Sequence, residues 1–336
     1  MKILWIFVLS LAHTTYAGLV PLENTIPSLA DTTYPRLSPE ENINLQQTCG
    51  REHPLFKKSL YKVLKGTEVQ PNEFSFMGAI RTFLRRRLWE SWNHATVNLG
   101  DAYKNFKESH CSAVLISKRH VLTAAHCVLF PALGQESYCR YHRGYIWVEK
   151  EYVQPSDLKV YVGTRCPKWG SCVPNRTVYE ATSIVPYPYY ETCWHTNDIA
   201  IVELGKDVDE SDGIPICMPN ENERLSETLL AVGYGHDLSA ATNQDKPGLQ
   251  LAEFHRYNDQ LEASQIISVD SVQSLCKGDS GGPLFHKKDG RYTLLGIASH
   301  ITPNCSDPAV ERQAHHTDVR KFLGWICEKT GVCPTA

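Results

Sequence analysis

The sequence predicts an all-β fold of the sandwich or barrel type that ends in a helix. Short apolar runs bounded by turn residues recur from about residue 63 onward, which is typical of such folds. Examples are residues 114–116, 160–162, 199–202, 229–232 and 293–297. In residues 319–329, apolar side chains recur instead at helical spacing. The body is therefore predicted to be strands, and the C-terminal stretch a helix.

The N-terminal residues 1–17 have the pattern of a secretory signal peptide. Lys2 supplies a positive charge, residues 3–12 form a short apolar run, and residues 15–17 are an acceptable cleavage site. The apolar run is too short to span a bilayer as a helix. We therefore expect a secreted, extracellular protein without a membrane span.

A polar segment, residues 18–48, follows the predicted signal peptide. It is rich in Pro, Asn, Glu and Thr and has little periodicity. Such a composition buries too little apolar surface to pack by itself. We expect this segment to be flexible.

Cysteine content and net charge limit the class of protein. The 336 residues carry a net charge of only −3, which gives no argument for a nucleic-acid partner. The 12 cysteines are even in number and fit an oxidising compartment. Neither Cys-x-x-Cys nor His-x-x-x-His spacing occurs, so disulfides are expected rather than a metal site.

Three short motifs supply a serine, a histidine and an aspartate. Ser280 lies in the Gly-rich stretch 277–283, His126 is followed directly by a cysteine, and Asp198 leads into an apolar run. Alone, each motif is more often a turn, a structural histidine or a helix cap. A serine hydroxyl, however, becomes a nucleophile when a histidine takes its proton and a buried carboxylate fixes that histidine. Together the motifs predict acyl transfer.

The glycines around Ser280 add a second catalytic element. A tight Gly-Asp-Ser turn can direct the backbone N–H groups of Gly278 and Ser280 at one point. Two such donors are what a tetrahedral oxyanion requires. The sequence therefore predicts an oxyanion hole in this turn.

On these motifs, the chain resembles the chymotrypsin-fold, trypsin-like family of secreted serine proteases, over roughly residues 49–326. The resemblance implies two packed, antiparallel, six-stranded β-barrels with the active site in the cleft between them. It makes Ser280 the nucleophile, His126 the general base and acid, and Asp198 the orienting carboxylate. Ser299 would support this triad and present its backbone to the substrate. No cofactor or metal is expected, because the chemistry uses side chains and water.

The resemblance also implies three disulfides. One ties the histidine loop, one closes a wall of the substrate pocket, and one holds the pro-segment to the body. In that order they are Cys111–Cys127, Cys276–Cys305 and Cys49–Cys217. The pairing of the other six cysteines stays open, and the pairs that we expect are Cys166–Cys172, Cys327–Cys333 and Cys139–Cys193.

Residues 61–68 resemble the family's activation site. Cleavage after Lys62 would free an α-ammonium group on Val63, which in the family pairs with the aspartate before the nucleophile, here Asp279. Lys65 departs from the family pattern, which has a glycine there. We expect a zymogen with a pro-segment over residues 18–62 and a protease domain over 63–336. The alternative is that Lys62 is an ordinary surface lysine.

The substrate pocket is predicted from three positions. By resemblance, Ser274 forms its base and Ile301 and Ala314 its walls. A serine provides no carboxylate, so cleavage after Lys or Arg is not expected. A branched side chain at Ile301 favours small or medium apolar residues, although Ser274 alone would also allow an open, chymotrypsin-like pocket. His300 stands where the family has tryptophan, and for the neighbouring pair His315–His316 we prefer a structural role to titration near neutrality.

Two surface features complete the prediction. Asn175 begins an N-glycosylation sequence in a polar stretch. The long insertion 83–109 contains Arg85, Arg86 and Arg87, which form either a basic exosite for an acidic partner or a solvated loop.

The function expected from these residues is a secreted serine endopeptidase. Its partners would be protein or peptide substrates, an activating protease and protease inhibitors, with the protein itself a monomer. The alternative is an inactive homologue that acts as a binding module, which Ile301, Lys65 and the non-glycine pair 112–113 favour. An esterase of the α/β-hydrolase class would place its histidine last in the chain, and that order is not found here.

Overall fold

The computed structural model describes residues 36–56, 67–69, 72–85, 106–131, 150–163, 177–235, 249–260, 264–271, 274–303, 305 and 311–334. All of them belong to one of the chain's two compact units, Pro35–Ala336. The expected signal peptide, the Lys62–Val63 cleavage site, Asn175 and residues 86–105 of the basic insertion lie outside the described residues.

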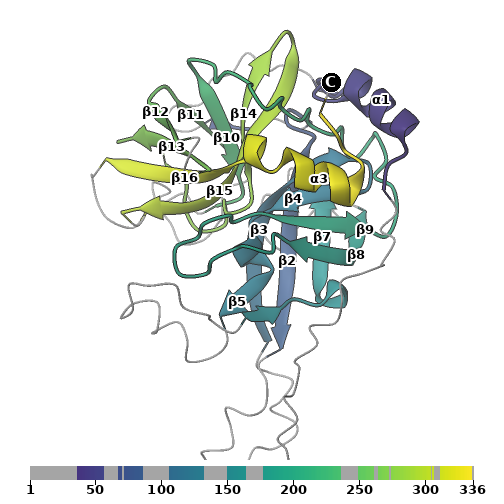
Figure 1. Cartoon of the computed structure of the whole chain (residues 1–336), viewed down its shortest axis with the longest axis horizontal. Helices are drawn as coiled ribbons and strands as arrows, with labels where there is room; N and C mark the ends of the chain where they lie inside the picture. The colour runs from purple at the N-terminus through teal and green to yellow at the C-terminus, as the bar shows by residue number, and fades with distance from the viewer. Residues whose placement is uncertain are drawn as a thin grey trace, which may run out of the picture. The chain divides into compact units, whose positions relative to one another are not determined.

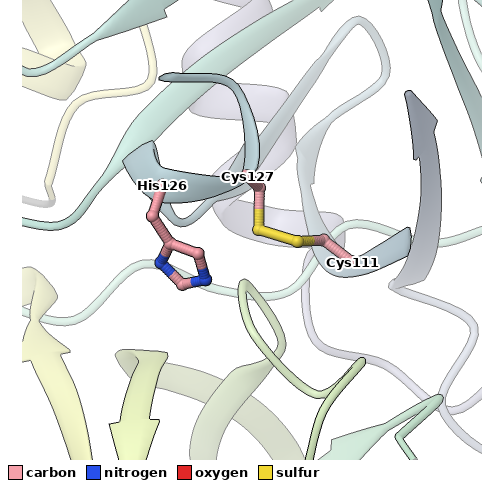
Figure 2. Close-up of side chains that lie close together, drawn as sticks. All are labelled: Cys111, His126 and Cys127. Carbon is pink, nitrogen blue, oxygen red and sulfur yellow. A yellow bond between two sulfur atoms is a disulfide. The ribbon is translucent and has the colours of Figure 1, made fainter. Parts of the chain in front are cut away.

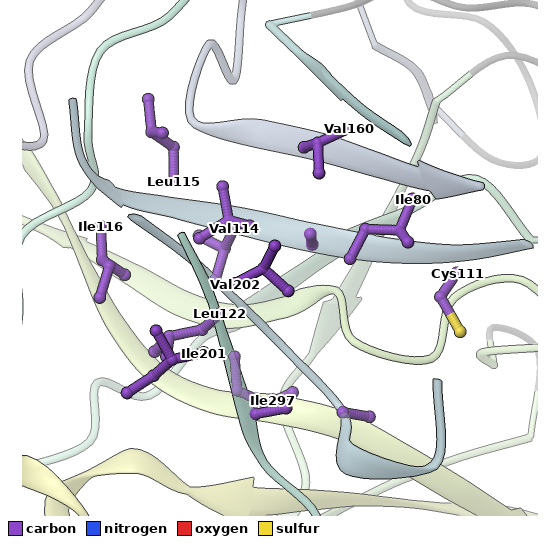
Figure 3. Close-up of a cluster of buried hydrophobic side chains, with 14 of the residues drawn as sticks. Ile80, Cys111, Val114, Leu115, Ile116, Leu122, Val160, Ile201, Val202 and Ile297 are labelled. Carbon is purple, nitrogen blue, oxygen red and sulfur yellow. The ribbon is translucent and has the colours of Figure 1, made fainter. Parts of the chain in front are cut away.

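The first sheet is a closed barrel of six antiparallel strands (Figure 1). In order around the barrel, the strands are β2 (Met77–Arg85), β3 (Phe106–Ser117), β4 (His120–Thr123), β9 (Ala200–Leu204), β8 (Val178–Pro186) and β7 (Leu158–Val162). Along β7, buried residues alternate with half-buried ones, as expected when one face of a strand points inward. Apolar residues of the barrel, including Ile80, Val114, Leu122 and Val202, are almost completely buried (Figure 3). This alternation explains why the short apolar runs of the sequence form a barrel.

The second sheet has eight antiparallel strands and is open. In order they are β1 (Thr67–Glu68), β11 (Gln250–Phe254), β10 (Leu229–Gly233), β14 (Pro283–Lys288), β15 (Arg291–Thr302), β16 (Arg312–Asp318), β13 (Gln265–Asp270) and β12 (Tyr257–Gln260). The prediction of two β-barrels is confirmed in outline. The second is half a barrel rather than a closed six-stranded one, because the short edge strands β1 and β12 do not pair with each other among the described residues.

The remaining elements of the body are short. They are β5 (Leu129–Pro131), which pairs with β6 (Lys150–Tyr152), and the 3-10 helices η3 (Ala125–Cys127), η4 (Pro155–Asp157) and η6 (Val319–Lys321). The predicted C-terminal helix is α3 (Leu323–Thr330), which buries Leu323 and Ile326 and ends at Gly331 in the left-handed conformation. No helix among the described residues is long and apolar enough to cross a membrane.

The segment predicted to be flexible contains a helix, α1 (Pro39–Thr48), so for these residues the prediction was wrong. The helix begins with a capping box: the Ser38 hydroxyl accepts from the backbone N–H of Glu41, and the Glu41 carboxylate accepts from that of Ser38. Pro39 occupies the first turn, where its missing N–H costs nothing. The sequence Ser-Pro-Glu-Glu thus carried a helix-start signal that composition alone concealed.

Helix α1 is fastened to the body at both of its ends. Beyond its C-terminus, Cys49 forms a disulfide with Cys217. The guanidinium group of Arg291 donates to the carbonyls of Gln46 (2.7 Å) and Gln47 (2.6 Å). In Figure 1 the helix lies beside the C-terminus of the chain. The N-terminal segment is therefore part of the folded body from residue 36 onward.

Ion pairs fasten the first turn of α1. The Glu41 carboxylate lies 3.1 Å from the Lys118 ammonium and 3.0 Å from the Arg119 guanidinium. The backbone hydrogen bond from Ser38, and then these cations, lower the pKa of Glu41 to about 2. The anion also suits the positive end of the helix dipole.

Candidate active site

His126 lies in η3, directly after strand β4. The next residue, Cys127, forms a disulfide with Cys111 on β3, which ties the histidine loop to the barrel (Figure 2). Because their sulfurs are joined to each other, these two cysteines cannot bind a metal beside His126. Ala125, directly before the histidine, and Cys127, directly after it, are almost completely buried, so the loop is anchored on both sides of the histidine.

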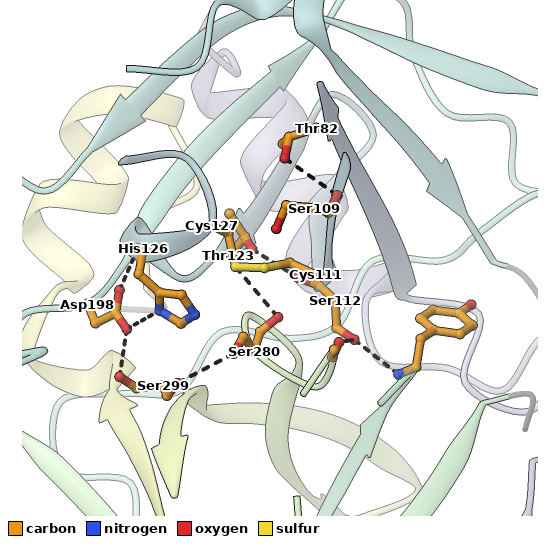
Figure 4. The surroundings of a disulfide bond; sticks show 12 residues. Thr82, Ser109, Cys111, Ser112, Thr123, His126, Cys127, Asp198, Ser280 and Ser299 are labelled. Atoms are coloured by element: carbon orange, nitrogen blue, oxygen red, sulfur yellow. Dashed lines mark hydrogen bonds and ion pairs between the residues drawn. A yellow bond between two sulfur atoms is a disulfide. The ribbon is translucent and has the colours of Figure 1, made fainter. Parts of the chain in front are cut away.

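Asp198 lies in the turn before β9, and its side chain is completely buried. The turn is tight, with Asn197 in the left-handed conformation at φ 55°. The carboxylate accepts from His126 Nδ1 (2.7 Å) and from the backbone N–H of His126 (2.9 Å). It also accepts from the Ser299 hydroxyl at 2.6 Å, so hydrogen bonds from both His126 and Ser299 fix the position of this carboxylate (Figure 4).

The buried pair of His126 and Asp198 sets the charge of the site. Burial alone would lower the pKa of His126, but the charge of Asp198 and the hydrogen bond to it outweigh burial and raise that pKa above its ordinary value. Burial raises the pKa of Asp198, yet the charge of His126 and the bonds from His126 and Ser299 lower it overall. Asp198 is therefore ionised at neutral pH and favours the proton on His126.

Ser280 lies in a tight turn before strand β14. Gly278 and Gly281 have φ values of 106° and 82°, which L side chains rarely adopt. The hydroxyl of Ser280 donates to the Ser299 carbonyl at 3.5 Å, so in this structure it is directed at β15 (Figure 4). No hydrogen bond among the described residues uses the backbone N–H of Gly278 or of Ser280. Both donors are therefore unused among the described residues, and their role as an oxyanion hole stays a prediction.

Ser112 is a residue of the site whose role the sequence did not reveal. Its hydroxyl donates to the Gly278 carbonyl (2.9 Å) and accepts from the backbone N–H of Tyr234 (3.1 Å). Its backbone N–H donates to the Ser280 carbonyl at 2.8 Å. A serine at this position was expected to weaken activity, because the family commonly has glycine there. In the structure, the hydroxyl instead braces the turn of the predicted oxyanion hole.

Asp279 lies in the same turn, directly before Ser280, and is buried. Its carboxylate accepts from the backbone N–H groups of Gly235 (2.7 Å) and Cys276 (2.8 Å). Burial raises the pKa of Asp279 to about 6, and these two bonds oppose the rise only in part. The carboxyl group thus lies buried without a cationic partner among the described residues.

A cavity of about 240 Å³ opens beside Ser280. Its lining consists of Leu275, Cys276, Lys277, Ser280, Ala298, Ser299, His300, Ile301 and Cys305. The disulfide Cys276–Cys305, which the resemblance implies, closes one wall. Of the three residues predicted for the substrate pocket, Ile301 lines this cavity, whereas Ser274 and Ala314 are not part of its lining. Ala314 is buried and pairs with Ile301 across strands β15 and β16.

A row of histidines extends along the site from His126, the predicted general base. The His195 ring lies 5.5 Å from that of His126 and 5.5 Å from that of His300, measured between ring centroids. His300 in turn stacks on His315 at 4.2 Å. Burial is the main cause that lowers the pKa of His195, His300 and His315, so these three are mostly neutral at pH 7. His316 is completely buried, and burial lowers its pKa to about 4, which fits the structural role we preferred.

His195 was not singled out from the sequence. It lies three residues before Asp198 in the loop between β8 and β9, and only the packing of this loop against β15 brings it to the site. The neighbouring Cys193 is disulfide-bonded. The four disulfides whose geometry the described residues give are Cys49–Cys217, Cys111–Cys127, Cys276–Cys305 and Cys327–Cys333.

Comparison with known proteins agrees with this geometry. The Trypsin family model matches residues 93–326. CLIP domain-containing serine proteases B15 and B4 of Anopheles gambiae are both 27% identical to this chain, over 64% and 65% of it. Phenoloxidase-activating factor 3 of Holotrichia diomphalia is 28% identical over 78% of this chain and 74% of that protein. The match covers 60% and 61% of the length of the two Anopheles proteins.

The chain therefore belongs to the trypsin family of serine proteases, which have the chymotrypsin fold. The family resemblance predicted from the three motifs is confirmed. The structure brings His126, Asp198, Ser280 and Ser299 together, and their individual catalytic roles stay predictions.

Proposed function

We propose that this protein is a secreted serine endopeptidase that hydrolyses peptide bonds through an acyl-enzyme. The observation that carries the proposal is the buried Asp198 carboxylate, 2.7 Å from His126 Nδ1. This contact fixes the proton on Nδ1 and leaves the Nε2 lone pair to act as a base. Ser280 lies in the turn before β14. The left-handed glycines of this turn and its unused backbone N–H groups match an oxyanion hole.

The reaction follows from this arrangement. Ser280 turns about its Cα–Cβ bond from the Ser299 carbonyl toward His126, transfers its proton to Nε2 and attacks the scissile carbonyl. The N–H groups of Gly278 and Ser280 stabilise the oxyanion. His126 then protonates the leaving amine as the C–N bond breaks, and a water, deprotonated by His126, hydrolyses the ester to release the acid and restore Ser280.

We propose further that the protein is made as a zymogen. Cleavage after Lys62 would create the α-ammonium of Val63, and Asp279 is suited to receive it. Its carboxylate is buried, and burial raises its pKa to about 6, so a cation would relieve the cost of ionising it. The Cys49–Cys217 disulfide and the contacts of α1 would keep the pro-segment attached after cleavage.

The lining of the cavity supports a preference for small or medium apolar side chains. Ile301 and Ala298 contribute apolar surface, and none of the described lining residues carries a carboxylate that would attract Lys or Arg. A pocket distinguishes side chains that differ by one methylene by only about 1–3 kcal/mol, so the preference is graded rather than absolute. An inactive homologue that acts as a binding module is the alternative function, and glycosylation at Asn175 is expected in either case.

The test is labelling of the recombinant chain with a serine-directed fluorophosphonate, before and after cleavage at Lys62. We expect labelling only after cleavage, and none in the Ser280→Ala variant. Profiling of the cleaved form on a peptide library should then give cuts after Ala, Val or similar residues. Cuts after Lys or Arg would refute the pocket assignment, and a folded, cleaved protein that is never labelled would favour the binding module.

A further inference from the structure

His126, His195 and Asp198 form a cluster in which one candidate ligand atom of each residue lies within 4.8 Å of the others. We propose that His126 and His195 together bind a transition-metal ion, with Zn²⁺ the best match, and that the ion inhibits the enzyme. The inhibition rests on the proposed protease function, whereas the binding site itself does not.

The separation of the two rings suits a shared ion. Zinc lies 2.0–2.1 Å from an imidazole nitrogen, so two imidazoles on one tetrahedral zinc have centroids roughly 5 Å apart. The rings of His126 and His195 are 5.5 Å apart and nearly perpendicular, at 79°. The rings of His300 and His315 are closer, at 4.2 Å, but they stack at 11°. Lone pairs in parallel planes cannot converge on one ion, so that pair is the poorer site.

Hydrogen bonds already orient the two histidines. His126 uses Nδ1 for Asp198, and His195 Nδ1 lies 3.4 Å from the Tyr190 hydroxyl. Histidines that bind metals commonly donate their other N–H to a carboxylate or another polar group, which fixes the tautomer and makes the free nitrogen more basic. In each ring this leaves Nε2 as the ligand atom. The buried charge of Asp198 adds attraction for a cation.

Both side chains are accessible and one of them can adjust. The side chain of His126 is 24% exposed and that of His195 is 37% exposed, so an ion can enter from solvent. His195 lies in a loop rather than a strand, so a small shift of the loop can bring its Nε2 within reach while Nδ1 keeps its contact with Tyr190. Water would complete the coordination. Imidazole selects zinc, copper or nickel rather than calcium or magnesium.

Binding would prevent catalysis at a defined atom. The Nε2 lone pair of His126, which would accept the proton of Ser280, is donated to the metal instead. The nucleophile then has no base, while Asp198 and the oxyanion turn are untouched. Removal of the ion by a chelator should restore the base.

The first experiment measures metal binding without activity. Zn²⁺ is titrated into the Ser280→Ala protein by calorimetry, alone and combined with His195→Asn. Asparagine is the best choice because His195 has φ 50°, a left-handed conformation that asparagine tolerates. His255→Asn, at an exposed histidine in the turn between β11 and β12, is the matched control, and circular dichroism checks the folding of each variant.

We expect one zinc site whose affinity falls by at least about tenfold with His195→Asn, since even loss of a residue behind a ligand costs 10–100-fold. His255→Asn should leave it unchanged. Equal zinc affinity in the His195→Asn and parent proteins would overturn the proposal, as would a site lost in both histidine variants.

The second experiment measures inhibition in the cleaved, otherwise unmodified protein. Activity in zinc is expressed relative to each variant's own activity in EDTA, and the zinc concentration for half-inhibition should rise at least about tenfold with His195→Asn. An equal zinc concentration for half-inhibition in the parent protein and in His195→Asn would overturn the proposal. If fluorophosphonate fails to label the cleaved protein in EDTA, the proposed protease function fails, and the calorimetry still decides the metal site.

Discussion

Ser112 connects the two halves of the candidate site through a single hydroxyl group. It comes from β3 of the first barrel, yet its hydrogen bonds reach Gly278 in the turn before Ser280 and Tyr234 at the end of β10. The Thr123 hydroxyl on β4 donates to the backbone carbonyl of Ser112 at 2.9 Å and fixes the position of this residue. Because Ser112 is completely buried, its hydroxyl and the two groups that it bonds are shielded from bulk water.

We therefore expect Ser112→Ala to damage both stability and catalysis. The Gly278 carbonyl and the Tyr234 N–H would lose a buried partner, which should cost about 1–3 kcal/mol in the free energy of unfolding. If the hydroxyl positions the oxyanion turn, kcat should fall while KM changes little. Urea unfolding and steady-state kinetics of the cleaved protein measure the two effects.

A matched control for this prediction is Ser268→Ala. Ser268 is equally buried, and its hydroxyl donates to the Ala314 carbonyl, away from Ser280. It should lose stability without a selective loss of kcat. A fall in kcat of the same size in both variants would mean that Ser112 acts only on stability.

The sequence reveals the role of a residue that lies in a short motif, but not the role of a residue that depends on distant neighbours. His126, Asp198 and Ser280 were predicted because each lies in a short local pattern with a known chemical use. Ser112 and His195 were not, because their roles arise from partners distant in the chain or from the path of a loop. A lone serine or histidine carries no pattern that separates a positioning role from an ordinary buried or surface one.

Helix α1 is the element whose stability depends most visibly on tertiary contacts. It has ten residues and buries none of them completely, so its intrinsic stability is marginal. Arg291 on β15 compensates by donating to two carbonyls in its last turn, where a cation also suits the helix dipole. Two hydrogen bonds from a charged side chain on a distant strand therefore add to the capping box and the ion pairs that stabilise this helix.

We expect Arg291→Ala to loosen α1 while the disulfide keeps it tethered. Loss of two hydrogen bonds from a charged donor should reduce the free energy of unfolding by about 2 kcal/mol. Amide hydrogen exchange within residues 39–48 should become faster, and exchange in the barrel should not. Arg224→Ala, at an exposed arginine, is the control, and equal exchange in both variants would refute the role of Arg291.

The sequence predicted elements well where burial leaves an apolar pattern and poorly where capping decides. Strand β9 was visible as an apolar run because all of its residues are buried. Strand β7 and helix α3 were visible because one face of each is buried. In α1 a polar composition concealed the helix, and only the capping box at Ser38 marked its start. The strand count of the second sheet also escaped prediction, because the pairing of short edge strands depends on long-range register.

At the scale of the whole molecule, the site exists only because the two sheets pack together. The first barrel provides His126 and Asp198, and the second sheet provides Ser299 and Thr317, which donate to the carboxylate and the carbonyl of Asp198. No single element contains the site. Because both sheets contribute to the site, the sequence predicted the three triad residues but not the residues that surround them.

The stability of the folded protein depends on pH through the buried carboxyl group of Asp279. Burial raises its pKa to about 6 from an ordinary value of 3.8, so the folded protein holds this proton more tightly than the unfolded chain. The stabilisation is complete below pH 3.8 and is lost as the pH rises through about 6. A shift of this size corresponds to about 3 kcal/mol. The uncleaved protein should therefore lose stability from this group between pH 4 and pH 7.

Cleavage at Lys62 should reverse the direction in which the contribution of Asp279 to stability changes with pH. An ammonium group paired with Asp279 would lower the pKa of the carboxyl below 3.8, and its stabilisation would then be lost as the pH falls. We expect the difference in unfolding free energy between the parent protein and Asp279→Asn to decrease from pH 4 to pH 7 before cleavage. After cleavage it should increase over the acidic part of the range. Urea unfolding of both proteins in both forms measures this, and taking the difference removes the contribution of every other titrating group. The same slope before and after cleavage would mean that no cation reaches Asp279, and the proposed activation step would have to be abandoned.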